Sequence, residues 1–216
     1  MAAITDVRAV LFDMDGVLID SESFYNQRRA AFLKAVGRAS QSGIDLSGFN
    51  DQASWETLVP DNAELRACLR AQYDEYRTTH PIDYATRSNP QAPELFKALH
   101  ARGVLTAICS SSEPTMISEY LDAQDLRDLV DFVISGSQCA HHKPQPDIYR
   151  NAMQALHVRP WQCLVVEDSP TGIQAGLGSG AVVGGLAQYS AGHLDPSEAH
   201  VVVDRLPEIL PFYRSQ

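Results

Sequence analysis

Six short apolar runs, rich in β-branched residues, recur along the chain and are separated by segments with helical spacing. The runs span residues 7–12, 104–109, 132–135, 163–166, 181–185 and 200–203. Each is too short and too continuous to be an amphipathic helix, so each predicts a buried strand. Helical patterns lie between most of them, at residues 93–103, 114–124, 147–158 and 170–180. The alternation predicts an α/β fold, with a parallel sheet covered by helices on both faces.

Residues 21–89 interrupt this alternation. Helical patterns at residues 24–36 and 63–76 are joined there by a polar, glycine-bearing stretch at 37–52. We therefore expect a helical insertion over residues 21–89, with residues 1–20 and 90–216 forming the sheet domain. The insertion has eight Lys/Arg and nine Asp/Glu, a net charge of −1, whereas the rest has nine and eighteen, a net charge of −9. Because its positive and negative charges nearly cancel, the insertion could supply cations to an anionic ligand.

The overall charge and the apolar runs exclude several classes of partner. A net charge of −10 argues against nucleic acid, because binding to a phosphate backbone depends on Lys and Arg. No apolar run reaches the ~20 residues of a membrane helix, and the first residues lack the pattern of a signal peptide. We expect a cytoplasmic protein with no membrane partner. Its four cysteines have no CxxC spacing, and we expect buried free thiols.

Acidic and hydroxyl side chains follow the strand-like runs at the positions where a parallel sheet binds ligands. Asp13 and Asp15 come directly after the first run, and their spacing of two projects both side chains toward one side of an extended backbone. The serines 110–112 follow the second run, before a predicted helix whose first amides favour a phosphate. These positions predict a site for an anion at one edge of the sheet.

Two further segments bring a cation and more carboxylates to the same edge. Lys143 lies beside Pro144 in a stretch that the prolines stiffen. Glu167 and Asp168 end the fourth run, and Ser169 is placed to cap the next helix. Converging carboxylates repel one another unless a hard divalent cation lies between them, and Mg²⁺ fits because it also keeps sites for water and substrate phosphate. A carboxylate can then attack phosphorus and form an aspartyl-phosphate.

Four segments carry a family resemblance: DMDGVLIDSE, the serine after the second run, KPQPDIY and VVEDSPTGIQAG. Together they resemble the signature motifs of the haloacid dehalogenase-like hydrolase superfamily, in the branch with β-phosphoglucomutase and small sugar-phosphate phosphatases. The match runs from residue 13 to residue 176 and does not cover the insertion. The order of four motifs is specific, whereas one alone is weak.

The resemblance implies a Rossmann-like core with a mobile helical cap, and it implies a role for each motif residue. Asp13 is the implied nucleophile and a metal ligand. Asp15 is implied to bind the metal through its backbone carbonyl and to protonate the leaving group. The transferring phosphoryl group is implied to be held by Ser110, Lys143 and the amides of Met14 and Ser111. The implied Mg²⁺ site is completed by Asp168 together with Glu167.

These features predict a Mg²⁺-dependent phosphatase for a small phosphorylated metabolite, a sugar or polyol phosphate, acting as a monomer or weak dimer. The main alternative is a sugar-phosphate mutase, but Tyr25 stands where mutases of this branch have an acid-orienting histidine. A haloacid dehalogenase needs neither a metal nor the second acid, so Asp15 and Asp168 argue against it. A phosphonate hydrolase would need a lysine in the insertion that forms a Schiff base. Lys34 is the only candidate there, and no other feature of the sequence supports that role for it. A last alternative is a binding protein that keeps the fold but has lost activity. The presence of every expected reactive group argues against it.

Overall fold

The computed structural model describes residues 7–44, 46, 51–189 and 197–212. The polar stretch expected at 37–52 lies partly outside them. The chain divides into two compact units, Met1–Asp20 with Tyr84–Gln216, and Ser21–Asp83. Residues 84–89 belong to the first unit, where the Asn89 amide donates to the carbonyl of Leu18 at 2.8 Å.

The first unit contains a six-stranded parallel sheet in the order β3-β2-β1-β4-β5-β6. Its strands are β1 (Ala9–Phe12), β2 (Leu105–Ser110), β3 (Phe132–Ser135), β4 (Cys163–Glu167), β5 (Val182–Leu186) and β6 (Val201–Val203). The central strand β1 is completely buried, as its uninterrupted apolar sequence predicts. In register, Phe12 lies opposite Ile108 of β2 and Val166 of β4. The predicted parallel sheet is confirmed.

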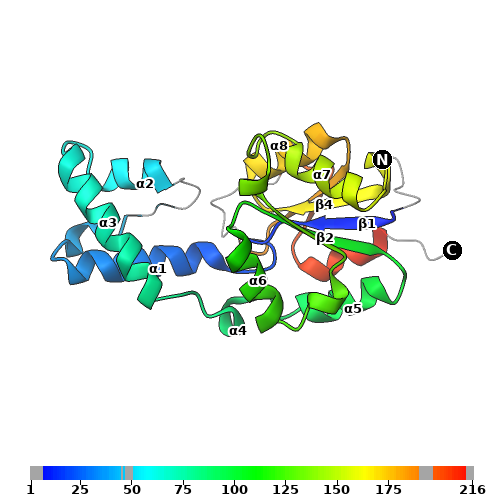
Figure 1. Ribbon diagram of the computed structural model, residues 1–216, viewed down its shortest axis with the longest axis horizontal. Helices are drawn as coiled ribbons and strands as arrows, with labels where there is room; N and C mark the ends of the chain where they lie inside the picture. Colours follow the sequence, from blue (N-terminus) through cyan, green and yellow to red (C-terminus); the bar gives the residue numbers. More distant parts are fainter. Residues whose placement is uncertain (1–6, 45, 47–50, 190–196, 213–216) are drawn as a thin grey trace. The chain divides into compact units, whose positions relative to one another are not determined.

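Helices cover both faces of this sheet, with α7 and α8 on one side and α5 and α6 on the other (Figure 1). Their bounds are α5 (Ala92–His100), α6 (Pro114–Ala123), α7 (Asp147–Ala155) and α8 (Pro170–Ser179), close to the four predicted segments. Ser169 caps α8 as expected, since its hydroxyl accepts from the Gly172 amide at 3.1 Å. The short helix α4 (Tyr84–Arg87) and 3-10 turns at 127–129, 136–138, 160–162 and 206–212 complete the described part of the unit.

The second unit is helical, with α1 (Ser21–Ala35), α2 (Asp51–Leu58), α3 (Ala63–Thr79) and a 3-10 turn at 39–41. Its core packs aromatic rings against one another: Phe32 lies 6.3 Å from Trp55 and 5.3 Å from Tyr73 between ring centroids. Asn62 caps α3 by accepting from the Leu65 amide at 2.8 Å. The unit therefore has an apolar core of its own.

All four cysteines are free. Cys109 and Cys163 are buried in strands, as expected. The expectation of burial is wrong for Cys68, which lies on an exposed position of α3, and for Cys139, which is half-buried after the 3-10 turn that follows β3.

Candidate active site

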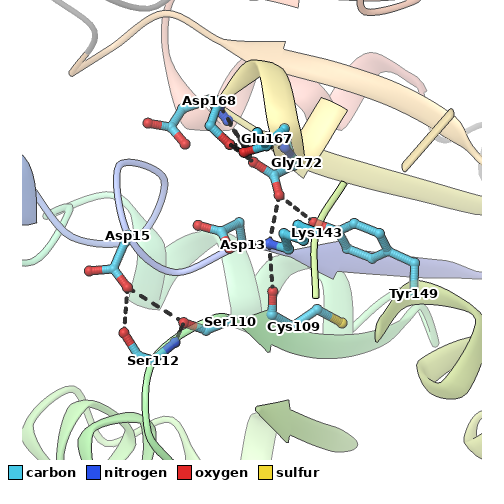
Figure 2. Close-up of polar contacts among 12 residues, drawn as sticks. Asp13, Asp15, Cys109, Ser110, Ser112, Lys143, Tyr149, Glu167, Asp168 and Gly172 are labelled. Carbon is cyan, nitrogen blue, oxygen red and sulfur yellow. Dashed lines mark hydrogen bonds and ion pairs between the residues drawn. The ribbon is translucent and has the colours of Figure 1, made fainter. Parts of the chain in front are cut away.

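The predicted site residues gather where β1, β2 and β4 end. Asp13 directly follows β1, Ser110 is the last residue of β2, and Glu167 is the last residue of β4. Because these parallel strands are neighbours in the order β2-β1-β4, their carboxyl ends meet at one edge of the sheet. The strand thus includes Ser110, whereas the sequence pattern placed this residue just past the end of the strand. Figure 2 shows these side chains together with Lys143.

The loop after β1 is a tight turn that brings two motifs into contact. The Met14 carbonyl accepts from the Leu18 amide at 2.8 Å, and Gly16 has a φ of +80°, which favours glycine. A Cβ on Gly16 would lie 1.8 Å from Asp168 Oδ2. Because Gly16 has no side chain, the loop after β1 can lie directly against the carboxylate of Asp168.

Lys143 is buried, with 7% of its side chain exposed, and its ammonium group is fully used. Nζ donates to Asp13 Oδ1 at 2.5 Å, to Glu167 Oε1 at 2.7 Å and to the Cys109 carbonyl at 3.1 Å. An ammonium group has three N–H donors, so all three are matched and its orientation is fixed. The cation therefore lies directly beside the carboxylate of Asp13.

Glu167 is completely buried and links the lysine to α7 and α8. Oε1 accepts from Lys143 and from the Tyr149 hydroxyl, the latter at 2.6 Å. Oε2 accepts from the Asp168 amide and the Ser169 hydroxyl, both at 3.2 Å. Both oxygens of this buried carboxylate are thus satisfied by protein donors.

Asp15 is held on one side by serine hydroxyls. Its Oδ2 accepts from Ser112 Oγ at 2.6 Å and from Ser110 Oγ at 3.5 Å (Figure 2). Its Oδ1 is buried and has no hydrogen-bond partner among the described residues. A buried polar atom without a partner is costly unless a ligand or water meets it. One oxygen of Asp15 is therefore anchored while the other is available for proton exchange.

The backbone amides predicted to bind phosphate are also available. Within the described ranges, the amides of Met14 and Ser111 donate to no protein acceptor. Free amides at strand ends bind anions well because their N–H dipoles are fixed in direction. This arrangement fits a phosphoryl group.

Burial dominates the electrostatics of the carboxylates. Desolvation raises the pKa of Asp13 to about 8, since the opposing effect of Lys143 is partly cancelled by Glu167 and Asp15. The pKa of Asp168 is raised well above its ordinary value by burial and then by Glu167 and Asp13. Burial alone would lower the pKa of Lys143, but Asp13 and Glu167 outweigh it and raise that pKa. The site thus holds more negative charge than its one lysine can neutralise.

Asp13, Glu167 and Asp168 each offer an oxygen within 4.8 Å of the others, close enough to share a metal ion. Hard carboxylate oxygens suit Mg²⁺, and no described side chain donates a hydrogen bond to the Asp168 carboxylate. The donor set therefore fits a divalent cation, which would relieve the repulsion that raises these pKa values. Glu167 is the least available of the three, because protein donors already meet both its oxygens.

Two side chains at the site were not among the predicted site residues. Ser112 was noted as one of three serines, but the pattern did not show which of them meets Asp15. Tyr149 ends the KPQPDIY motif, but nothing in that motif showed that its hydroxyl reaches Glu167. Only the packing of α7 and the course of the loop after β2 bring these groups into place.

A family model of haloacid dehalogenase-like hydrolases matches residues 7–180. The chain belongs to this family, as its four motifs suggested.

Several curated proteins that are similar to the chain are phosphatases. Hexitol phosphatase B of Escherichia coli strain K12 is 26% identical over 193 residues, which cover 81% of each chain. Fructose-1-phosphate phosphatase YqaB of the same strain is 29% identical over 180 residues, covering 79% of this chain and 92% of the relative.

A crystal structure of β-phosphoglucomutase from Clostridium difficile has the same fold, with a TM-score of 0.69 and 20% identity over 96% of this chain and 97% of that one. In the described part of the chain, no helix is long and apolar enough to span a membrane.

Proposed function

We propose that this protein is a Mg²⁺-dependent phosphatase that hydrolyses a small phosphorylated metabolite through an aspartyl-phosphate on Asp13. The observation that carries the proposal is the position of Asp13. Its carboxylate contacts the fixed ammonium of Lys143 and lies within metal-sharing distance of Asp168. A carboxylate nucleophile can approach an anionic phosphate only where cations neutralise the charge of both.

In the first step, an Asp13 carboxylate oxygen forms a bond to phosphorus while the bond from phosphorus to the substrate alcohol breaks. Asp15 gives its proton to the departing alkoxide. Its Oδ1, buried and without a partner among the described residues, is the atom that suits this transfer. The amides of Met14 and Ser111, with the Ser110 hydroxyl, hold the equatorial oxygens of the phosphoryl group.

In the second step, Asp15 takes a proton from water, and the water oxygen bonds to phosphorus. The bond between phosphorus and Asp13 breaks, which releases inorganic phosphate and restores both carboxyl groups to their starting states. The hydrogen bond from Ser112 to Asp15 keeps the acid and base in one orientation through both steps.

Mg²⁺ would be held by the carboxylates of Asp13 and Asp168 and by the Asp15 carbonyl, with Glu167 acting beside them. When bound, it supplies positive charge for the phosphate oxygens and lets the carboxylates stay ionised. The donor set of buried carboxylates with raised pKa values supports this assignment.

A sugar or polyol phosphate is the substrate class that the phosphatase relatives support, since their names specify hexitol phosphate and fructose 1-phosphate. We assign the choice of substrate to the helical unit, Ser21–Asp83, because the side chains assigned to phosphoryl transfer all lie in the sheet unit. Exchanging this unit for that of hexitol phosphatase B should change the ranking of substrates while phosphate release continues. An unchanged ranking would assign selection to the sheet unit.

The mutase alternative rests on the shared fold with β-phosphoglucomutase. A mutase must delay hydrolysis of the aspartyl-phosphate, and its relatives do so with a histidine at the position of Tyr25. A phenol with a pKa near 10 cannot share protons near neutral pH as imidazole does. Tyr25 instead packs within the helical unit, where its ring lies 5.2 Å from the Arg28 guanidinium. We therefore favour hydrolysis of the aspartyl-phosphate over the mutase reaction.

A panel of phosphorylated sugars and polyols tests the proposal by measuring released inorganic phosphate with Mg²⁺, with EDTA, and with the Asp13→Asn variant. We expect release from at least one substrate, loss of activity in EDTA with recovery on adding Mg²⁺, and a loss of at least ~10³-fold in Asp13→Asn. Near-normal turnover by that variant, or full activity without metal, would contradict the mechanism.

A further inference from the structure

Tyr149 lies between the lysine loop and the fourth motif, at a position that the mechanism above does not use. It is the third residue of α7, and it is completely buried. Its hydroxyl donates to Glu167 Oε1 at 2.6 Å, and its ring centroid lies 5.2 Å from Lys143 Nζ (Figure 2). The side chain therefore contacts both members of the buried ion pair.

Glu167 Oε1 is the atom on which this arrangement depends. It accepts from Tyr149 and from Lys143 at the same time. A carboxylate oxygen accepts about two good hydrogen bonds, so the two donors together define the direction in which this oxygen points. If the Tyr149 donor is removed, Oε1 can rotate, and the Lys143 ammonium can follow it away from Asp13.

We propose that the Tyr149 hydroxyl is a positioning group for phosphoryl transfer, which fixes Glu167 so that Lys143 stays on Asp13. The inference rests on the proposed phosphatase function and adds a residue to it. Tyr149 contacts neither the nucleophile nor the reacting phosphorus, and it acts through Glu167. Small displacements of charged groups matter here because the site is desolvated. In such an environment the energy of an ion pair depends steeply on its geometry.

The hydroxyl is the donor in this contact, because an ionised carboxylate offers only acceptor atoms. Burial raises the pKa of Tyr149 well above its ordinary value, and the negative charges of Glu167 and Asp13 raise it further. The proton of this hydroxyl thus stays in place and points to an acceptor.

A purely structural role for Tyr149 can be distinguished from a positioning role, because the chain contains a matched control. Tyr149→Phe keeps the ring and removes one oxygen. Tyr120, on α6, is also completely buried, but its hydroxyl has no hydrogen-bond partner among the described residues. Tyr120→Phe therefore removes the same atom from the core without removing a contact to the site.

The test measures kcat and KM for p-nitrophenyl phosphate at saturating Mg²⁺, together with Tm. Tyr149→Phe should lower kcat by about 10- to 100-fold, as expected for one hydrogen bond to a charged group, with KM changed less than about threefold. Tyr120→Phe should keep kcat within about twofold, as expected for a hydroxyl that makes no hydrogen bond. Wild-type kcat in Tyr149→Phe, or an equal loss in both variants, would overturn the inference.

A double-mutant cycle identifies the route of the effect. In a Glu167→Gln background, Tyr149→Phe should cost less than about threefold, because the residue through which it acts is already altered. Full additivity of the two losses would show that Tyr149 does not act through Glu167, and it would overturn the proposal.

A measurement without substrate or metal separates this inference from the phosphatase proposal. In ¹⁵N-labelled, metal-free protein, the Lys143 ammonium, assigned by its loss in Lys143→Met, should exchange its protons slowly. The exchange should be at least about 10-fold faster in Tyr149→Phe, as expected when a buried hydrogen-bond network loses one member, and unchanged in Tyr120→Phe. Wild-type exchange in Tyr149→Phe would overturn the positioning role even if the enzyme is a phosphatase. If no monoester is hydrolysed, the exchange result still decides the role of Tyr149.

Discussion

Replacing Gly172 by alanine perturbs the candidate site without changing any of its chemical groups. Gly172 lies in the first turn of α8, and a Cβ there would lie 1.9 Å from both Cδ and Oε1 of Glu167 and 2.0 Å from Oε2. The whole carboxylate must move by about 1.5–2 Å to reach an ordinary van der Waals separation. Such a shift breaks the hydrogen bonds from Lys143 and Tyr149.

The magnitude follows from these opposing effects. Overpacking costs about 1–3 kcal/mol, and weakening a hydrogen bond to a buried charge costs about 1.5–3 kcal/mol. Alanine in place of glycine within a helix returns about 0.5–1 kcal/mol. We therefore expect Gly172→Ala to lower the free energy of unfolding by about 1.5–5.5 kcal/mol, and to lower kcat about 100-fold or more because Lys143 leaves Asp13.

Gly178→Ala is the matched control, since Gly178 lies on the same helix and its added Cβ would meet Pro146 at an ordinary 3.6 Å. This variant should keep wild-type kcat and gain about 0.5–1 kcal/mol. Urea denaturation and phosphate release measure both quantities. If Gly172→Ala is as stable and as active as Gly178→Ala, the close packing of Gly172 against Glu167 does not hold the site together.

Two further predictions concern the metal and the acid. The folded-state pKa of Asp13 is raised from 3.8 to about 8, so the stability that this proton gives the metal-free protein is lost progressively as the pH rises from about 4 to about 8, while fewer protons compete with Mg²⁺. The Mg²⁺-induced rise in Tm should therefore be larger at about pH 8.5 than at about pH 6.5, and an equal rise at both would show that metal binding is not linked to these carboxylates. Ser112→Ala should lower kcat about 10-fold with little change in KM, because Asp15 loses its 2.6 Å hydrogen bond, and a change in KM alone would place Ser112 in substrate binding instead.

The fold was predictable because the inner strands of a covered parallel sheet are buried on both sides and so leave continuous apolar runs. The central strand around Leu11 and its neighbour around Val165 are completely buried, and both were found from the apolar pattern alone. The end of the helical insertion was predicted at residue 89, whereas the compact helical unit ends at Asp83. Residues 84–89 follow the helical insertion in sequence, but the hydrogen bond from Asn89 to Leu18 places them with the sheet.

The site was predictable as far as the topology determines it. Asp13, Ser110 and Glu167 come together because three neighbouring parallel strands end at one edge. Contacts made by helix packing carry no such pattern. Tyr149 reaches Glu167 across 18 positions of sequence, and an aromatic residue on a helix is typical of any apolar core.

The most direct test of the account is a burst measurement with Asp15→Asn and p-nitrophenyl phosphate. Nitrophenolate leaves without a proton, so Asp13 can still be phosphorylated, whereas hydrolysis of the intermediate lacks its base. We predict a burst of about one nitrophenolate per enzyme followed by slow turnover, with the phosphoryl group trapped on Asp13 after borohydride reduction and peptide mass spectrometry. Steady turnover without a burst, or a covalent label on any other residue, would contradict the assignment of Asp13 as the nucleophile.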